Sequence, residues 1–410
     1  MKKKKKNKKW LHLAYFFLFA FFLGFIYTLL VYVGIWHKIT LGFKAIPFWA
    51  YPLWLIFSFY FTLTCHELGH FFSFIFQKVS IRALYITIFI FYKSEKGFRI
   101  SINPKLWVLF GGLVVPELGV IDNEETYQKK VKAFTNALIT APIVTIVLLI
   151  SSWILTILLM IYSNHSNLIG LVTLNTIFIT LLSLLYIYTF RLSNPIFYGD
   201  IVAHKKMKTD QIFQMVQISQ YTMFSLVESD STEAFLFDKT RYFLKQTAFN
   251  YSLMHIMLLT QYIEGILYKK YEIDLEIDSK IRNLNINQFL RNEQGFMLAN
   301  DLAYYYYVNQ DVDKAYQVIK QIYSKEYTKL NKKLFTYIKK KSYHLLHLED
   351  NHDFLSNKEN IYLGAIWIFD RLIDPFLNLN EQHEPFPFVT YATEVNLEVD
   401  EDKEKSDIIA

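Results

Sequence analysis

The sequence predicts a mainly α-helical protein: a bundle of about four membrane-spanning helices with a membrane-associated β-hairpin, followed by a cytoplasmic all-α domain. Three observations lead to this fold class. The 410 residues are 53% hydrophobic and 18% aromatic, with a mean hydropathy of +0.18, which is more apolar than an ordinary soluble protein. The apolar runs crowd into the first 200 residues, whereas Lys, Asp, Glu, Asn and Gln are abundant in the second half. Helical periodicity continues through that polar half, where glycines and prolines are few.

Four apolar runs are long enough to cross a bilayer, for which a helix needs about 20 residues. The first follows the basic segment MKKKKKNKK. It is too long for a signal peptide and has no small-x-small cleavage site after it, so we expect an anchor. The third and fourth runs are joined by the short polar link SNHSN and are therefore expected to be antiparallel neighbours. The four spans are expected at residues 10–36, 48–76, 134–162 and 168–192.

The positions of Lys and Arg predict the orientation, because these residues are concentrated in cytoplasmic loops. They gather before the first span, between the second and third, and after the fourth, while the other loops carry only Lys38 and Lys44. Four spans that start from a cytoplasmic N-terminus place every basic segment on one side. We therefore expect a multi-pass cell-membrane protein with both termini in the cytoplasm. The abundance of Lys, Asn, Ile, Phe and Tyr indicates an AT-rich, bacterial genome.

The second span contains three ionisable residues in the stretch FTLTCHELGHFFSFIF, residues 61–76. His66 and His70 stand four apart, so a helix places both imidazoles on one face, close enough to share one ion. With Glu67 they form the H-E-x-x-H arrangement, in which two histidines bind zinc and the glutamate takes a proton from the attacking water. Interhelical hydrogen bonding or a proton relay is the alternative. One divalent cation, however, satisfies all three groups at once.

The single cysteine, Cys65, limits other chemistry. One thiol in 410 residues excludes an intramolecular disulfide and a cysteine-based zinc site. Because Cys65 precedes His66 by one position, it points about 100° away from the ligand face. We expect it to be a small core residue.

A catalytic zinc usually has three protein ligands and one position for water. The first 200 residues contain only two aspartates. Asp122 lies in the polar segment VIDNEETYQKK, which we expect to be a solvated surface loop. Asp200 lies in FRLSNPIFYGDIV, just after the fourth span, and is the expected third ligand. His204, Glu117 and a site that lacks the third ligand remain as alternatives.

The stretch before Asp200 has a turn signal. Asn194 and Pro195 should end the fourth helix, and Gly199 would permit a tight turn back towards the membrane. Asn194 could also donate a hydrogen bond to a substrate, although Asn before Pro is common simply as a turn.

The region between the second and third spans has a pattern typical of strands. RALYITIFIFYKSEKGFRISINPKLWVLF contains two runs rich in β-branched and aromatic residues, separated by KSEKG. A hairpin at the membrane surface could hold a substrate in extended form by adding it as a further strand. A simple connecting loop is the alternative.

These motifs resemble those of the site-2 protease type of intramembrane zinc metalloprotease. Members carry H-E-x-x-H on one core helix and, on another, an Asn-Pro stretch ending in Asp-Gly, whose Asp is the third ligand. HELGH matches at His66, Glu67 and His70, whereas in NPIFYGD a glycine precedes Asp200 instead of following it. FRISINPKLWVLFGGLVVP is similar to the family's β-hairpin, and TAPIVTIVL to its Ala-Gly-Pro, with Ala141 for Gly. The matches cover residues 46–205.

The resemblance implies a zinc endopeptidase that cleaves membrane-embedded peptides or protein segments, with Glu67 as general base, His66, His70 and Asp200 as zinc ligands, and Asn194 binding the substrate. The lipid bilayer is then a second partner. A membrane protein of the same fold that captures a membrane-active peptide, in an immunity role, is the alternative, favoured by the altered Gly199-Asp200 order. A metal or proton transporter is a third reading.

The sequence predicts three parts: a transmembrane metalloprotease-like domain at 1–206, a cytoplasmic helical domain at 207–380 and a mobile acidic tail at 381–410. LANDLAYYYYVNQDVDKAYQVIKQIY, residues 298–323, resembles a tetratricopeptide hairpin. Such helices could offer a groove to a cytoplasmic peptide or protein partner. No nucleic-acid partner is expected, and the tyrosines at 304–307 are expected in the core.

Overall fold

The computed structural model describes most of the chain, and that part is mainly helical with one small antiparallel sheet, as predicted. It forms two compact units, Met1–Gly69 with Thr140–Arg191 and His70–Ile139 with Leu192–Ala410. The domain limits expected from the sequence stay a prediction, and the acidic tail lies outside the described residues. The described residues are 9–94, 97–104, 106, 111–194, 198–222, 224–225, 229–269, 271–324, 332–357 and 360.

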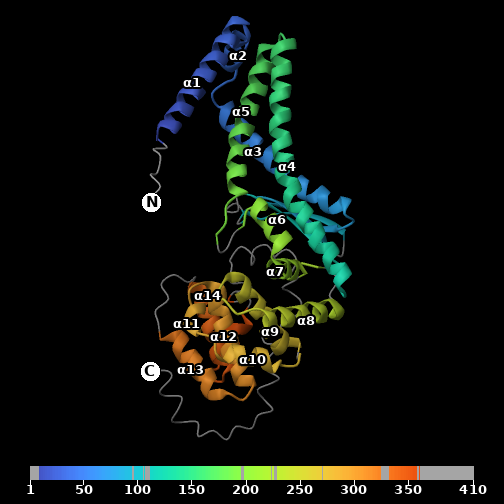
Figure 1. The fold of residues 1–410 in the computed structure, drawn as a ribbon, viewed down its shortest axis with the longest axis vertical. Coiled ribbons are helices and arrows are strands. Elements are labelled where there is room, and N and C mark those ends of the chain that lie inside the picture. Colours follow the sequence, from blue (N-terminus) through green and yellow to red (C-terminus); the bar gives the residue numbers. More distant parts are fainter. Residues whose placement is uncertain are drawn as a thin grey trace, which may run out of the picture. The chain divides into compact units, whose positions relative to one another are not determined.

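The first unit consists of long apolar helices (Figure 1). Three described helices are apolar and long enough to cross a membrane, and a fourth span is possible only if the bent pair α2 and α3 counts as one. The two helices of that pair meet at 105°. The helices of the first unit are α1 (Lys9–Tyr32), α2 (Ile35–Ala45), the first part of α3 (Ala50–Phe76), the second part of α4 (Glu124–Tyr162) and α5 (Ser166–Thr189).

The first span is shorter than predicted because the chain turns at Gly34, where φ is 75° and only glycine is free of strain. After the turn comes α2, a helix in a segment that was expected to be a loop. It packs closely on α5: a Cβ atom added to Gly42 would lie 2.3 Å from the carbonyl oxygen of Ser166. Small residues permit such close helix packing where no hydrophobic effect draws helices together.

Uncharged polar side chains join the helices of the first unit. Ser58 of α3 donates to Asn175 of α5 at 2.7 Å, and the hydroxyls of Thr156 and Thr176 lie 2.7 Å apart between α4 and α5. Large apolar side chains cover the outside, and α1 is exposed along its whole apolar window. A surface of this kind is suited to lipid.

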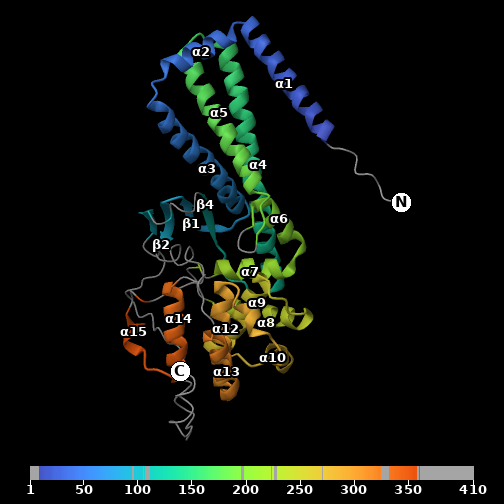
Figure 2. The ribbon, with the colours of Figure 1, turned by 90° about the vertical axis from the view of Figure 1, so that its left-hand side faces the viewer.

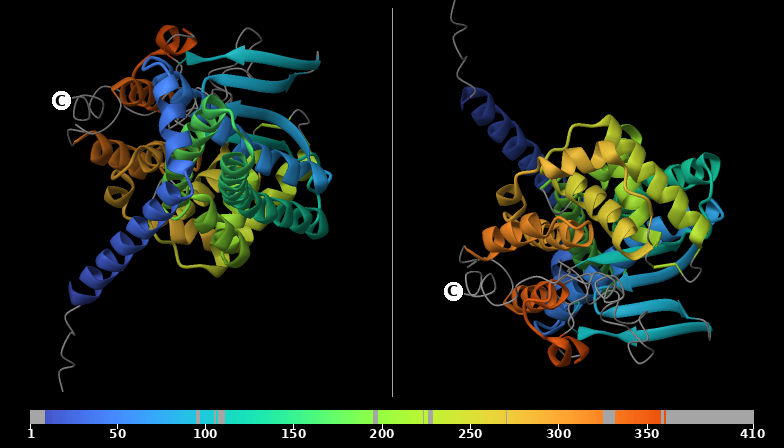
Figure 3. Two further views of the ribbon diagram at one scale, coloured as in Figure 1. Left: turned by 90° about the horizontal axis from the view of Figure 1, so that it is seen from above. Right: turned by 90° about the horizontal axis from the view of Figure 1, so that it is seen from below.

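The second unit contains a four-stranded antiparallel sheet, in the order β3-β2-β1-β4 (Figures 2 and 3). The predicted hairpin is present as β2 and β3, but it is half of the sheet. The run RALYITIFIFY, expected as one strand, is two, because Thr87 adopts φ of 51° and reverses the chain. Pro116 is tolerated because β4 is an edge strand. The strands are β1 (Ser80–Ile86), β2 (Phe89–Ser94), β3 (Gly97–Ile102) and β4 (Gly112–Glu117).

The other elements that the structure describes in the second unit are helices, and several of them begin at side-chain caps, as at Ser229 and Asn292. The chain folds back from α12 to α13 at Gln310, where φ is 62°, so the predicted helical hairpin is present (Figure 2). A tetratricopeptide repeat stays a prediction. The helices are α6 (Asp200–Thr209), α7 (Gln211–Thr222), α8 (Asp230–Gln246), α9 (Leu253–Lys269), α10 (Leu275–Arg282), α11 (Ile286–Phe289), α12 (Glu293–Val308), α13 (Val312–Tyr323), α14 (Lys332–Leu345) and α15 (His352–Ser356).

The core of this unit includes α12. Tyr304, Tyr305 and Tyr306 are at most 3% exposed, and Tyr307 is partly buried. The prediction that these tyrosines belong to the core is confirmed.

Candidate metal centre

One unbroken helix carries the H-E-x-x-H motif. The boundary between the two units falls inside α3, between Gly69 and His70, so the helix itself fixes His66 relative to His70. One turn separates them, and both imidazoles lie on one face. His66 is 6% exposed and His70 is partly buried.

The ring of His66 is held by its neighbours in the first unit. Its Nδ1 lies 2.9 Å from the hydroxyl of Thr145 on α4, and that hydroxyl donates its own hydrogen to the carbonyl oxygen of Ala141. The hydroxyl therefore accepts a hydrogen bond from Nδ1–H. Phe190 stacks on the ring, with centroids 4.9 Å apart. The remaining nitrogen, Nε2, then carries the lone pair that a metal needs.

The ring of His70 is also held through its Nδ1 atom, by a residue of the second unit. Its Nδ1 lies 2.9 Å from the carbonyl oxygen of Ala137, and since a carbonyl can only accept, Nδ1 carries the hydrogen. Its Nε2 lies 3.5 Å from Oδ2 of Asp200. A lone pair and a carboxylate oxygen at this distance repel each other unless a proton or a metal cation lies between them. This arrangement fits a metal site.

Asp200 is the first residue of α6, where the helix dipole favours an ionised carboxylate. A closed loop leads to it: Ser193 pairs with Tyr198, and the N–H of Gly199 donates to the carbonyl oxygen of Leu192 at 2.9 Å. Gly199 has φ of −66° and ψ of 156°, which any residue adopts. The return of the chain is thus made by the bridged loop, and the conformational freedom expected of Gly199 is not used.

The three side chains form one group. The ligand atoms of His66, His70 and Asp200 lie within 4.8 Å of one another, and no second group of this kind occurs among the described residues. Two imidazole nitrogens and one carboxylate oxygen suit zinc and leave a fourth position for water. The structure therefore shows the proximity expected of Asp200, while ligation itself is proposed below.

The alternative ligands lie elsewhere. His204, one turn after Asp200 on α6, directs Nδ1 to the carbonyl oxygen of Thr135 at 2.7 Å. Glu117 accepts a hydrogen bond from Ser225. Asp122 is exposed, as expected of a surface loop.

The remaining motif residues stand outside the metal group. Glu67 is 4% exposed and follows His66 on α3. Asn194 is exposed in the loop before α6. Cys65 is partly buried. The roles of Glu67 and Asn194 stay predictions.

Two supporting residues were missed in the sequence, Gly69 and Thr145. A Cβ atom added to Gly69 would lie 2.7 Å from the Cα of Ala141, so Gly69 lets α3 approach α4 closely. Thr145 follows Ala141 by one turn and orients His66. Two features of the sequence indicate these residues. Gly69 is the small residue inside HELGH, and Thr145 lies in the segment TAPIVT, which is similar to a family motif.

The chain was compared with models of protein families. The model of peptidase family M50 matches residues 54–343, more than half of the chain, and this range includes HELGH and Asp200. No matching curated protein and no matching solved structure were found. Together with the apolar helices, the match supports a membrane metalloprotease in general. The chain belongs to peptidase family M50, the site-2 protease family, as its motifs predicted.

Proposed function

We propose that the protein is an intramembrane zinc endopeptidase that cleaves membrane-embedded peptides or protein segments. His66, His70 and Asp200 hold the zinc ion, and Glu67 is the general base. The observation that carries the proposal is the pair of imidazoles whose Nδ1 atoms are both engaged. Such outer hydrogen bonds orient histidine ligands and raise their basicity in metal sites.

The residues of the chain divide the work around the metal. When bound, zinc lowers the pKa of a coordinated water to about 7 and polarises a peptide carbonyl. Glu67 accepts the proton of the attacking water and delivers it to the leaving nitrogen, which balances the hydrolysis. Its burial keeps bulk water away from the reacting atoms. Asn194 donates a hydrogen bond from its side-chain amide to the substrate backbone.

The substrate must reach the site unwound, because a helix in a bilayer satisfies all its backbone groups internally. The sheet has two edge strands, β3 and β4. An extended substrate segment that pairs with one of them exchanges its helical hydrogen bonds for ladder hydrogen bonds. The protein is then a multi-pass cell-membrane enzyme with cytoplasmic termini, an orientation supported by its basic segments.

The test compares membranes from cells that express the parent protein or its Glu67→Gln variant. Mass spectrometry of new peptide termini is expected to find cleavage inside apolar segments only with the parent. The purified Glu67→Gln variant should keep near-stoichiometric zinc, because Glu67 is not a ligand, and His66→Ala should lose it. Identical termini in both membranes would contradict the protease proposal and favour the peptide-binding alternative.

A further inference from the structure

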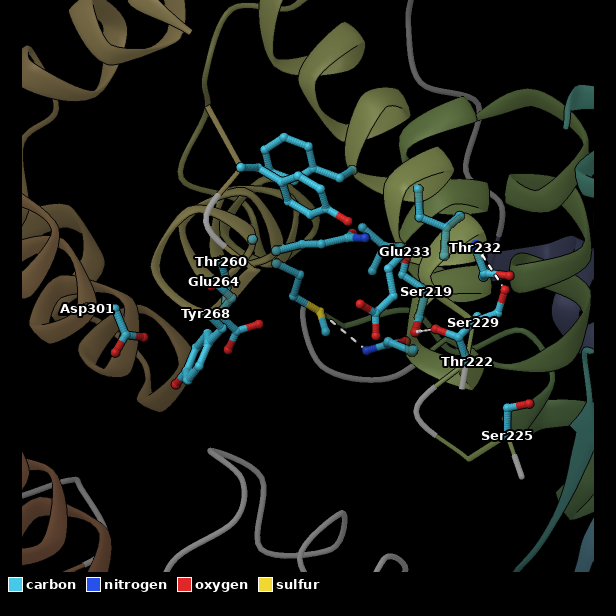
Figure 4. A pocket seen from close by; sticks show the side chains of 18 of the residues that line it. Ser219, Thr222, Ser225, Ser229, Thr232, Glu233, Thr260, Glu264, Tyr268 and Asp301 are labelled. Atoms are coloured by element: carbon cyan, nitrogen blue, oxygen red, sulfur yellow. Dashed lines mark hydrogen bonds between the residues drawn. The ribbon is translucent and has the colours of Figure 1, made fainter. Parts of the chain in front are cut away.

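A partly open cavity of about 740 Å³ lies within the second unit. Side chains of α7, α8, α9 and α12 supply most of its wall, as Figure 4 shows. Its volume is within the range of about 300–1,000 Å³ that ligand sites usually have. The cavity belongs to no part of the metal centre described above.

The charge of the cavity is one-sided. Its described lining includes three carboxylates, Glu233, Glu264 and Asp301, and no Lys, Arg or His. Asp301 projects from α12 towards Tyr268 and Glu264 of α9 (Figure 4). The side chain of Glu264 is exposed to this partly open cavity. Desolvation by the surrounding protein, followed by repulsion from Asp301, raises the pKa of Glu264 to about 7, while Lys341 lowers the pKa of both Glu264 and Asp301. The two acids are thus close enough to repel each other, and an added cation would relieve that repulsion.

The remaining wall has the chemistry of a peptide site. Aromatic rings of Phe237 and Tyr271 stack with centroids 4.3 Å apart, and Met257 and Met297 supply the adaptable apolar surface that binding sites often use. Neutral hydroxyl and amide side chains, such as Gln261, are interleaved with them. An extended peptide needs all three features: apolar contacts, neutral partners for its backbone, and carboxylates for a basic side chain.

The cavity is joined to the metal centre through two consecutive helices. Asp200 begins α6, and α7, which follows after Asp210, forms part of the cavity wall. Asp210 accepts a hydrogen bond from the N–H of Phe213, and Gln214 donates to the carbonyl oxygen of Met207 at 2.7 Å. These bonds fix α7 on α6. A ligand in the cavity therefore contacts a helix that is firmly connected to the one carrying Asp200.

We propose that this cavity binds a basic, extended segment that flanks the membrane-embedded part of the substrate, with Glu264 and Asp301 receiving a Lys or Arg side chain. The identification of the ligand as a substrate flank rests on the proposed protease function. Lys and Arg gather at the cytoplasmic ends of membrane helices, so a membrane segment that lies with its flank in the cytoplasm presents this chemistry. Arg and Lys can also lie over the aromatic rings of such a wall.

Peptide binding by the full-length protein in lipid nanodiscs tests the proposal. The probe is a fluorescent hexapeptide with two arginines between leucines, and its matched control has citrulline, which is neutral and nearly isosteric, at both positions. We expect at least tenfold tighter binding of the arginine peptide. Equal affinities, or no binding of the arginine peptide, would overturn the proposal without any variant being made.

Variants then locate the site. Glu264→Gln combined with Asp301→Asn should weaken binding of the arginine peptide at least tenfold and leave the citrulline peptide unaffected. The matched control, Glu272→Gln with Asp238→Asn, removes two exposed carboxylates outside the cavity and should change affinity less than twofold. An equal loss in both double variants would show a general charge effect and refute the assignment to this cavity.

The same measurement separates this inference from the protease proposal. The Glu67→Gln variant should bind the arginine peptide as the parent does, because the cavity does not use Glu67. Charge-dependent binding without any proteolysis would leave the cavity site standing and remove the protease function. Proteolysis without charge-dependent binding would do the reverse.

Discussion

The Nε2 atom of His70 lies 3.5 Å from Oδ2 of Asp200, and the Nδ1–H of the same ring is engaged by the carbonyl oxygen of Ala137. The first distance joins His70, in the C-terminal half of α3, to the first residue of α6. The second leaves the lone pair of Nε2 facing a carboxylate. This combination is favourable only with a proton or a metal cation between the two atoms, and the grouping of His66 with them, within 4.8 Å, favours a shared metal cation.

Removing a residue that only hydrogen-bonds to a metal ligand lowers metal affinity roughly 10–100-fold. Asp200→Asn changes a ligand itself and should therefore lower zinc affinity by more than this. The amide has the same size but lacks the negative charge. Zinc content of the purified protein and titration with a chelator measure the effect. Asp122→Asn is the matched control, because it changes the other aspartate of the first 200 residues in an exposed loop. Unchanged zinc in Asp200→Asn would remove Asp200 from the ligand set and bring His204 forward.

Thr145→Val should weaken zinc binding about 10–100-fold, since it removes the hydroxyl that accepts from His66 while keeping the shape of the side chain. Thr145→Ser retains the hydroxyl and should stay close to the parent. The same chelator titration compares the two. If valine and serine behave alike, the hydroxyl does not orient the imidazole.

The sequence could predict the features that depend on neighbouring residues. The spacing of His66 and His70 determines their common face as soon as α3 forms, because a helix repeats every 3.6 residues. The long apolar helices followed from local hydropathy in the same way. The proximity of Asp200 to His70 is a tertiary contact between residues far apart in the sequence, which local pattern does not encode. It could be inferred only from chemical need and from the resemblance of NPIFYGD to a family motif.

Features that depend on tertiary packing or on one backbone angle were missed. The reversal at Thr87 divides one apparent strand into two. It was missed because a β-branched residue rarely adopts positive φ and so does not indicate a turn. The helix α2 lies in the short segment between the first two spans, which was expected to be a loop, although Ile35, Ile39 and Phe43 recur there at helical spacing. Gly69 carries no chemistry of its own, so its importance appears only when Ala141 is seen beside it.

Gly69→Ala should lower both zinc affinity and thermal stability, although alanine is the better helix former by about 1 kcal/mol. The added methyl group would lie 2.7 Å from the Cα of Ala141, so α3 and α4 must separate. Gly24→Ala on α1 is the control, because nothing lies within 4 Å of its added methyl group. Thermal unfolding in detergent compares the two, and a Gly69→Ala variant as stable as Gly24→Ala would argue against close packing here.

Labelling of introduced cysteines tests the orientation. In a Cys65→Ser background, Lys132→Cys and His165→Cys place single thiols near the beginning of α4 and just after its end. Both positions are exposed. If α4 crosses the membrane, a membrane-impermeant maleimide added to intact cells should label position 165 and leave position 132 unlabelled until the cells are opened. Labelling of both from outside would rule out the four-span model.

The raised pKa of Glu264 predicts a pH-dependent stability. Desolvation, and then repulsion from Asp301, raises the pKa from 4.5 to about 7 in the folded protein, against the smaller opposing effect of Lys341. Between these two values the folded state binds more protons than the unfolded state, so the free energy of unfolding falls as the pH rises. Glu264→Gln removes this loss. The variant should therefore unfold at a higher temperature than the parent at pH 8, with a smaller difference at pH 5, in circular dichroism of the full-length protein in detergent.

The control is Glu272→Gln, which changes an exposed acid outside the cavity and should show no such dependence on pH. If the unfolding temperatures of the parent and of Glu264→Gln differ by the same amount at both pH values, Glu264 is ionised without cost in the folded protein. The cavity would then lack the unfavourable carboxylate pair that a cation is proposed to relieve.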